Sequence, residues 1–436
     1  MTLALIGFAA VIALSLAGVR IAFASLIVGF VGFGLIRGWQ AAQALVGQQV
    51  VEHAMSYNLS VIPLFVLMGV FIYRSDIAGD LYDAAHAGLG RLRGGLAHST
   101  VLASAGFAAV CGSSLATAAT MTRVAMPSMK RFSYADRLSA GTIAAGGTLG
   151  IMIPPSVPLV IYGIVAEQDV GLLFIAGILP GLILVLLFLT TISIWAALSP
   201  GLVPTIEPTA GDKKTADKSR AGLRASLPVL LLFVLVLGGI YGKVFTPTEA
   251  AGIGAVGAAV IAVVRGHFRT LKEWRDGLAE SALTTASLFM VLFGTTVFAQ
   301  FINLTGMPFD LMRFVEWAEV DGVGLVIYIA IIAVLMGMIF EAIGILLLIV
   351  PVFVPAMVAA QIDLIWFGIV VVLVTELGLI TPPVGMNVFV VKNAMPELKI
   401  GTIFIGVLPF VLAILAALAL VLSVPEIATL LPQLAS

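Results

Sequence analysis

Ten stretches of this chain are long and apolar enough to cross a lipid bilayer as helices, which limits the possible folds more than any other feature. A helix needs about 20 apolar residues to cross a hydrocarbon core of roughly 30 Å. Hydrophobic residues make up 61% of the sequence and charged residues 10%, whereas soluble domains are about 25% charged. We expect full spans at 2–18, 21–36, 59–73, 138–165, 171–198, 227–242, 246–264, 281–303, 363–391 and 401–424.

This composition also excludes several classes of protein. A soluble enzyme, a nucleic-acid-binding protein and a disordered chain all need far more polar surface. Cys111 is the only cysteine, so no intramolecular disulfide is possible. The first apolar stretch has no basic flank before it and no small-residue cleavage site after it, so we interpret it as a retained span.

Two further apolar stretches, 95–129 and 322–358, are each too long for one span and are interrupted near the middle. The interruption is Cys111-Gly112-Ser113-Ser114 in the first, and the second contains Glu341 and Gly344. Each stretch is therefore predicted to enter the membrane and return as a re-entrant hairpin.

Charged loops predict the orientation, because Lys and Arg accumulate on the cytoplasmic side. Basic residues flank the first hairpin at both ends, and the segments 199–226 and 265–276 are also basic. The acidic loop between 304 and 321 is then external, and so are both ends of the second hairpin and both chain termini. The acidic residues used are Glu167, Asp169, Asp310, Glu316, Glu319 and Asp321.

The chain divides into two halves, 1–203 and 227–436, joined by a polar cytoplasmic linker at 204–226. Each half holds five full spans and one hairpin. The mixed polar and apolar segments 38–58 and 76–94 suit helices that lie in the membrane interface.

The two halves are related by an internal repeat. A shift of 228 residues places Pro127 on Pro355 (355 minus 127), and the same shift aligns further pairs of residues. Because each half has an odd number of spans, the second half is expected to be inverted, an architecture typical of secondary transporters. The aligned pairs are Met129 with Met357, Leu149-Gly150 with Leu377-Gly378, and Pro154-Pro155 with Pro382-Pro383.

The two Pro-Pro pairs predict broken helices at 138–165 and 363–391. Proline removes a backbone donor and pushes the preceding residue, Ile153 or Thr381, out of helical geometry. The carbonyls left without partners, together with hydroxyls, are oxygen ligands of the kind sodium uses. The alternative is a simple proline kink, which is common in membrane helices.

The tip of the first hairpin, Gly112-Ser113-Ser114, is a second candidate site. A leg of about 15 residues spans roughly 22 Å, which reaches the membrane midplane. The two helix ends that meet there carry opposite partial charges, one suited to an anion and the other to a cation. Alternatively, these serines and the threonines beyond them only pack helices together.

Charged residues inside a membrane are costly and usually functional. Glu341, at the second tip, could ligate a cation, contact substrate or carry a proton. Arg123, in the returning leg of the first hairpin, could clamp a carboxylate, or pair with Glu341 or a helix end, or extend to the cytoplasm. Glu376 could be an ion-pair partner, and Asn387 could bind polar substrate groups or join two helices.

The motifs resemble those of the large membrane subunit of tripartite ATP-independent periplasmic (TRAP) transporters. They follow the order of that family along the whole chain. The residues that carry the resemblance are Cys111-Gly-Ser-Ser-Leu-Ala-Thr-Ala-Ala-Thr120, Gly147-Thr-Leu-Gly-Ile-Met-Ile-Pro-Pro-Ser156, Phe174-Ile-Ala-Gly-Ile-Leu-Pro-Gly181, Phe245-Thr-Pro-Thr-Glu-Ala-Ala251 and Thr381-Pro-Pro-Val-Gly-Met-Asn387.

This resemblance implies an all-α, elevator-type importer of organic acids in the bacterial inner membrane, coupled to sodium and needing no other cofactor. It implies two partners, a periplasmic substrate-binding protein and a separate small membrane subunit of about four helices.

The resemblance also implies where the ligands bind. One sodium would lie between the Gly112-Ser113-Ser114 tip and the Gly150–Ser156 break, which includes Pro154. The other would lie between Glu341 and the Gly378–Thr381 segment. The candidate substrate-binding residues are Arg123, Ser156, Glu341 and Asn387. Relatives often carry Asp at the second tip, where this chain has Glu341.

Three alternatives stay open at this point. A stand-alone carboxylate transporter of related hairpin architecture would need no small subunit. A membrane-embedded protease would use Ser113 as nucleophile, but serine needs a nearby base and no histidine lies near a predicted midplane position. A channel would not need two occluding hairpins. The four histidines are residues 53, 86, 98 and 267.

Overall fold

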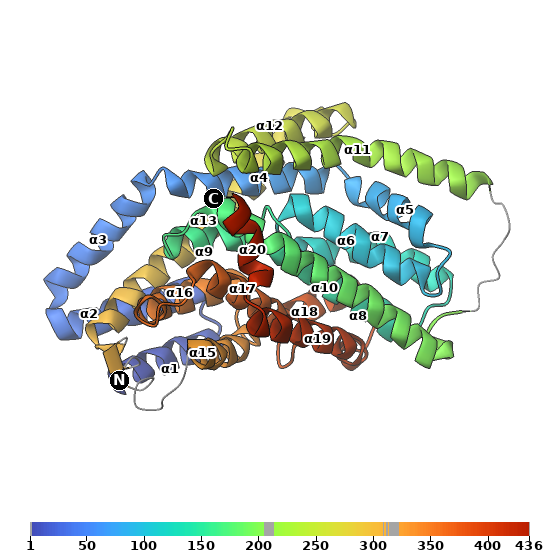
Figure 1. Ribbon diagram of the computed structural model, residues 1–436. Coiled ribbons are helices and arrows are strands. Elements are labelled where there is room, and N and C mark those ends of the chain that lie inside the picture. The colour runs from blue at the N-terminus through green and yellow to red at the C-terminus, as the bar shows by residue number, and fades with distance from the viewer. Residues whose placement is uncertain (1, 205–212, 308, 311–312, 314–321, 436) are drawn as a thin grey trace.

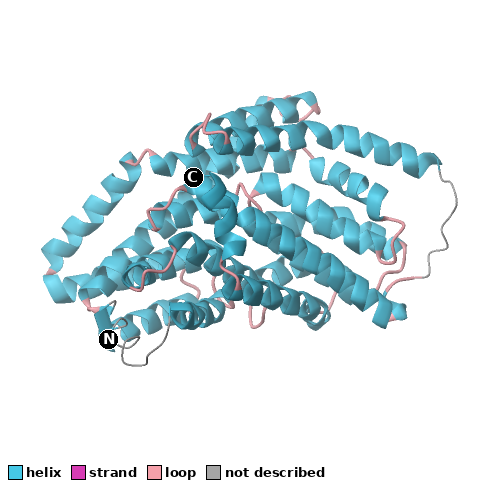
Figure 2. Ribbon diagram, in the orientation of Figure 1, coloured by secondary structure: helices cyan, strands magenta, loops and turns pink. Residues whose placement is uncertain are grey.

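The computed structural model describes residues 2–204, 213–307, 309–310, 313 and 322–435, and the regular elements in these ranges are all helices (Figure 2). The ten predicted spans and both predicted hairpins fall on helices, so the predicted all-α fold is confirmed. Part of the 204–226 linker, and Glu316, Glu319 and Asp321 of the acidic loop, lie outside the described residues.

The first half contains ten α-helices in the described residues, and the break in the fourth predicted span separates two of them. The helices are α1 (Thr2–Leu16), α2 (Ile21–Arg37), α3 (Trp39–Met55), α4 (Val61–Arg74), α5 (Ile77–Leu89), α6 (Gly95–Cys111), α7 (Ser114–Arg131), α8 (Asp136–Met152), α9 (Val157–Val165) and α10 (Val170–Leu198).

The second half ends with a short helix, α20, that the hydropathy pattern did not predict, because it follows the last apolar span. The described helices are α11 (Lys213–Tyr241), α12 (Pro247–Val264), α13 (Leu271–Leu304), α15 (Gly322–Gly337), α16 (Ala342–Ala359), α17 (Leu364–Ile380), α18 (Met386–Ala394), α19 (Ile400–Ser423) and α20 (Glu426–Ala435).

By length and hydropathy, seven helical stretches in the described residues could cross a membrane, or eight if a bent pair counts as one span. Six of the ten predicted spans are among these seven, and the seventh stretch is α16, a leg of the second hairpin. The other four predicted spans fall on α1, α2 and α17, which have only 15 to 17 residues, and on α4, which has 14. The bent pair joins α3 to the segment Asn58–Arg74 at an angle of 67°.

The helix bounds follow the register of the sequence repeat. The hairpin legs α7 and α16 begin and end 228 residues apart (342 minus 114, and 359 minus 131), and so do α8 and α17 (364 minus 136, and 380 minus 152). Figure 1 shows α6 and α7 on the right of the molecule and α15 and α16 on the left.

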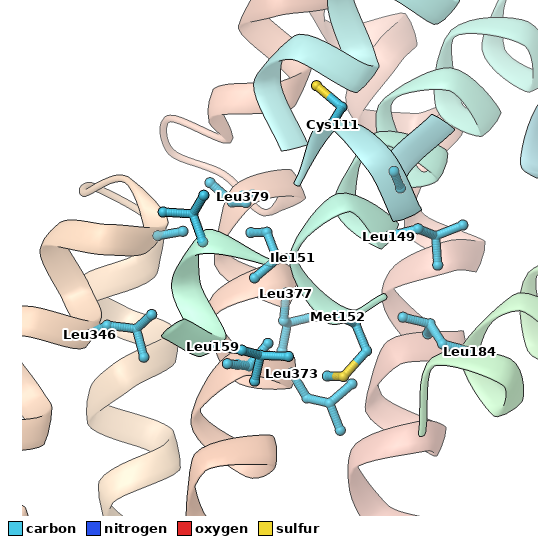
Figure 3. Close-up of a cluster of buried hydrophobic side chains, with 14 of the residues drawn as sticks. Cys111, Leu149, Ile151, Met152, Leu159, Leu184, Leu346, Leu373, Leu377 and Leu379 are labelled. Atoms are coloured by element: carbon cyan, nitrogen blue, oxygen red, sulfur yellow. The ribbon is translucent and has the colours of Figure 1, made fainter. Parts of the chain in front are cut away.

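The ends of the broken helices meet in an apolar cluster between the two halves (Figure 3). Met152 and Leu159 flank the first break, and Leu373 and Leu377 precede the second; all four side chains are buried. The Tyr162 hydroxyl of α9 also donates to the backbone carbonyl of Leu364 in α17. The two halves are therefore in direct contact at their breaks.

Candidate functional site

The first hairpin turns at Gly112 and Ser113. Gly112 has a φ of 61°, a left-handed conformation that glycine adopts without steric cost. Ser113 caps α7, because its hydroxyl accepts the Ala116 N–H at 3.4 Å, a role for which serine is strongly preferred. The chain therefore reverses direction within two residues and presents the N-terminus of α7 at the tip.

The first break follows directly from its two prolines. Ile153 N–H still donates to the Leu149 carbonyl at 3.1 Å. Pro154 and Pro155 have no N–H to offer the carbonyls of Gly150 and Ile151, four residues earlier. These carbonyls are left without their helical donors, and the broken helix resumes at α9.

The first tip lies against the first break, backbone to backbone. A methyl group added at Gly150 would lie 2.9 Å from the carbonyl carbon and oxygen of Ser113. One added at Gly112 would lie 3.1 Å from the Pro155 carbonyl oxygen. The structure therefore brings together the residues predicted for the first sodium site, Gly112, Ser113, Ser114, Gly150 and Pro154.

The second hairpin meets the second break in a similar way. A methyl group added at Gly378 would lie 2.5 Å from the Cα of Gly337, and Val384 N–H donates to the Met338 carbonyl at 3.2 Å. The Thr381 hydroxyl donates to carbonyls of its own helix, those of Leu377 at 3.0 Å and Gly378 at 3.2 Å. This leaves the lone pairs of the Thr381 oxygen available as acceptors.

Glu341 lies at the second tip, as predicted, in the N-cap position of α16. Its side chain makes no capping hydrogen bond and is partly buried. Within the described residues, no group of three or more His, Cys, Asp or Glu side chains could hold a metal ion. A cation at either tip would therefore be bound mainly by backbone and hydroxyl oxygens, with Glu341 as the only carboxylate predicted to take part.

The two halves are joined by a hydrogen bond between Ser114 and Asn387. Asn387 Nδ2 donates to Ser114 Oγ at 2.8 Å and to the Ala144 carbonyl at 3.0 Å, and both side chains are buried. Ser114 is the first residue of α7, and Asn387 lies in the first turn of α18. Two helix N-termini, one from each half, therefore meet here, and such ends attract anions.

Ser156, a predicted substrate-binding residue, has a structural role in this conformation. Its buried hydroxyl caps α9 by accepting the Leu159 N–H at 3.4 Å. Ser156 lies at the break, since a methyl group at Gly112 would be 3.7 Å from its Cα. It is thus beside the first tip, but its side chain is engaged within its own helix.

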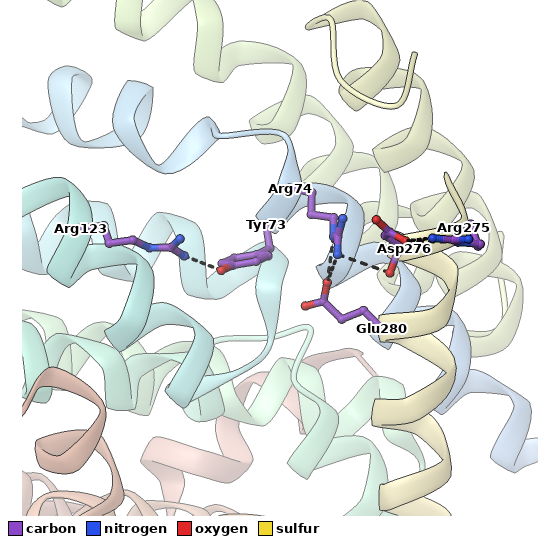
Figure 4. Close-up of polar contacts among 6 residues, drawn as sticks. All are labelled: Tyr73, Arg74, Arg123, Arg275, Asp276 and Glu280. Atoms are coloured by element: carbon purple, nitrogen blue, oxygen red, sulfur yellow. Dashed lines mark hydrogen bonds and ion pairs between the residues drawn. The ribbon is translucent and has the colours of Figure 1, made fainter. Parts of the chain in front are cut away.

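Arg123 lies away from the tips. It is nine residues beyond Ser114 on α7, or about 14 Å along the helix axis. Its side chain is exposed, donates to the Tyr73 hydroxyl (Figure 4) and stacks over the Tyr73 ring at 5.5 Å from the centroid. The structure does not bring Arg123 together with Asn387, and neither Glu341 nor a helix-end carbonyl is its hydrogen-bond partner.

Glu376 is completely buried in α17, and neither carboxylate oxygen makes a hydrogen bond or ion pair in the described part of the chain. The prediction that Glu376 serves as an ion-pair partner is therefore wrong for this conformation.

Tyr73 and Gly337 were not singled out from the sequence, because no local sequence pattern identifies a residue as the neighbour of a hairpin tip.

Comparison with known proteins covers nearly the whole chain. Residues 3–427 match the family model described as tripartite ATP-independent periplasmic transporter, DctM component. The chain is 36% identical over 382 residues to the C4-dicarboxylate TRAP transporter large permease protein DctM of Pseudomonas aeruginosa, covering 88% of each chain. It is 32% identical over 387 residues to the sialic acid TRAP transporter large permease protein SiaM of Vibrio cholerae, covering 89% of each.

Among solved structures, the fold resembles that of the Alcanivorax borkumensis YdaH transporter. The TM-score is 0.61, the sequence identity is 17%, and the match covers 89% of this chain and 88% of that one. This likeness concerns the fold alone. The family match and the two relatives show that the chain belongs to the DctM family, the large permease proteins of tripartite ATP-independent periplasmic transporters.

Proposed function

We propose that this permease imports an organic carboxylate across the bacterial inner membrane, driven by a sodium gradient. The two hairpins and the two broken helices form a domain that carries substrate and ions, and the remaining helices form a scaffold. The domain slides relative to the scaffold and exposes the site first to the periplasm and then to the cytoplasm. Both chain termini then lie on the periplasmic side.

The observation that carries this proposal is the meeting of two helix N-termini at Ser114 and Asn387. Each N-terminus holds roughly half a positive charge from the helix dipole. Two of them pointing at one buried locus favour an anion. Secondary transporters with inverted repeats bind their substrates at such half-helix ends near the midplane.

The sodium proposal rests on the tip-to-break contacts of both halves. Gly150 lies against Ser113, and Gly378 lies against Gly337. The prolines leave carbonyls without donors beside each tip. Sodium is a hard cation that oxygen atoms of this kind coordinate. The two tip-to-break contacts give one proposed site in each half. Glu341 adds one carboxylate, at the second site only.

The substrate proposal draws on the printed names of the relatives, a C4-dicarboxylate permease and a sialic acid permease. Both substrates carry carboxylates, which suits the electropositive locus. Asn387 and the tip serines would bind the substrate, and Ser156 and Glu341 would border the site. Because Arg123 contacts Tyr73 and not the tip, we leave it out of the binding site in this conformation.

The proposed assembly has three parts, as the word tripartite in the family description implies. A periplasmic binding protein would deliver the substrate, and a small membrane subunit would widen the scaffold, while lipid surrounds both. Co-purification of a small membrane protein with this chain would separate this assembly from a stand-alone transporter.

Thermal unfolding of the purified protein in sodium, potassium or choline at equal ionic strength tests the proposal. A cation that binds only the folded state raises the unfolding temperature by mass action. We expect a saturable rise specific to sodium, which weakens in Ser113→Ala and in Thr381→Ala. Equal unfolding temperatures in the three salts, with no sodium-dependent carboxylate uptake in vesicles, would overturn it.

A further inference from the structure

The first hairpin tip touches helix α4 at a point where only glycine fits. A methyl group added at Gly69 would lie 2.8 Å from the carbonyl oxygen of Cys111 and 3.7 Å from its Cα. Cys111 is the last residue of α6, directly before the turn. The backbone of the tip therefore rests directly on the surface of α4.

The same face of α4 makes a second contact with the hairpin, through Tyr73. Gly69 and Tyr73 are four residues apart and share one helix face. The Arg123 guanidinium donates to the Tyr73 hydroxyl and stacks over its ring (Figure 4). One face of α4 thus holds both legs of the hairpin, α6 by close packing and α7 by a polar contact.

Helix α4 itself is fixed to its neighbours. Arg74 forms an ion pair with Glu280 of α13 at 2.7 Å and donates to the Asp276 carbonyl at 3.4 Å. Phe71 packs edge-on against Phe268, with ring centroids 5.0 Å apart. These contacts hold α4 against α13 and the segment before it. Helix α4 is therefore the fixed element of this pair, and the hairpin is the element that can move away from it.

We infer that Tyr73 and Arg123 are positioning residues that hold the first hairpin against α4 in the conformation described, and that this contact separates when the hairpin moves. The inference rests on the proposed function, in which the hairpins move relative to the scaffold. The Arg123 side chain is exposed and that of Tyr73 is partly exposed, so the contact is weak enough to break during a transport cycle.

A native cysteine can be used as a chemical probe of this contact. Cys111 is the only cysteine, lies at the contact with Gly69, and is 8% exposed. Its rate of modification by N-ethylmaleimide in the purified protein should report how often the tip leaves α4. No other thiol contributes to the signal.

Three variants should accelerate labelling of Cys111. Tyr73→Phe removes the hydroxyl acceptor, Arg123→Gln removes the cation, and Gly69→Ala forces a methyl group against the Cys111 carbonyl. We expect about a three-fold increase for Arg123→Gln, the size expected from losing one exposed cation–aromatic contact. Tyr73→Phe keeps the ring and loses only the hydrogen bond, so its increase should be smaller. Gly252→Ala in α12 is the matched control, since its methyl group would meet only Leu64, at 4.0 Å.

The double variant Tyr73→Phe/Arg123→Gln separates a shared contact from two independent effects. If the two side chains act only through their contact with each other, the double variant should label no faster than Arg123→Gln alone, which already removes that contact. Unchanged labelling in all three single variants, or additive effects in the double variant, would overturn the inference. Accelerated labelling in a protein that shows no sodium-dependent uptake would uphold the contact and reject the proposed function.

Discussion

Ser114 and Asn387 lie 273 positions apart in the sequence, yet each donates a hydrogen bond to the other's side chain, at 3.0 and 2.8 Å. They join the first hairpin to the second broken helix, so the proposed binding site belongs to neither half alone. The proposed site is therefore complete only when both halves have folded and packed against each other.

Loss of Asn387 should affect the protein more than loss of Ser114. Asn387→Ala leaves both the Ser114 hydroxyl and the Ala144 carbonyl without this partner. Ser114→Ala leaves Asn387 with its bond to Ala144. Removing one partner of a buried hydrogen bond costs about 1–3 kcal/mol.

Thermal unfolding and carboxylate uptake of both single variants and the double variant would measure this difference. The two effects should be non-additive, because the residues share a contact. Equal losses of stability in Ser114→Ala and Asn387→Ala would contradict the greater role given to Asn387.

The Thr381 hydroxyl should contribute to sodium affinity. Thr381→Val keeps the shape of the side chain and removes the oxygen, whereas Thr381→Ser keeps the oxygen. We expect the valine variant to raise the sodium concentration for half-maximal uptake about ten-fold, which corresponds to about 1.4 kcal/mol. The serine variant should remain near the parent protein. The same sodium dependence in both variants would remove Thr381 from the proposed site.

The helix breaks could be predicted from the sequence because their causes are local. Two adjacent prolines remove two donors wherever they occur, and a Gly-Ser-Ser run ends one helix and caps the next. The helices α8 and α17 accordingly end at Met152 and Ile380, directly before the segments that contain the proline pairs. The span lengths were less reliable, since hydropathy does not reveal where a short helix such as α1 stops.

The pairing of side chains between distant segments could not be predicted in the same way. Sequence places Arg123 in the returning leg of the hairpin, but its distance from the tip and the position of Tyr73 depend on tertiary packing. For Glu376, the sequence predicts a costly charge inside the membrane, but it cannot tell whether a partner faces it. Asn387 illustrates the same limit, because both of its hydrogen-bond partners come from the other half of the chain.

Alanine at Gly378 should separate the second tip from the second break. Its methyl group would lie 2.5 Å from the Cα and 2.6 Å from the carbonyl carbon of Gly337, and backbone atoms cannot rotate away. We expect a loss of about 1–3 kcal/mol in stability, as for other overpacked cores, and a weaker sodium-dependent rise in unfolding temperature.

Gly238→Ala in α11 is the control for this variant, because no atom lies within 4 Å of the added methyl group. It should be neutral or stabilise the helix by up to about 1 kcal/mol. If Gly378→Ala unfolds at the same temperature as the control and keeps its full response to sodium, the close contact is not required.

The ion pair between Lys130 and Glu397 should make stability depend on pH in the acid range. Lys130 donates to Glu397 at 2.5 Å and thereby lowers the pKa of that carboxyl. Because the folded-state pKa is lower than the unfolded value of about 4.3, the contribution is complete above that pH. It disappears as the pH falls through the folded-state pKa.

Unfolding temperatures of the parent protein and Glu397→Gln, measured from about pH 7 to pH 3, would test this dependence. The difference between them should shrink at the acid end. Glu426→Gln, at another exposed carboxylate, controls for the general loss of charge. A difference that is constant with pH would mean that the pair does not stabilise the fold.

The predicted inversion of the two halves can be tested by the sidedness of two loops. Gly201→Cys lies after α10, in the segment expected to be cytoplasmic, and Phe309→Cys lies in the segment expected to be periplasmic; both positions are exposed. Placed singly in a Cys111→Ser background, they should react with a membrane-impermeant maleimide from opposite sides. We expect Phe309→Cys to react in intact spheroplasts and Gly201→Cys only after the membrane is opened. Labelling of both from the same side would mean that an even number of crossings separates them, whereas the three predicted spans between them, 227–242, 246–264 and 281–303, require opposite sides.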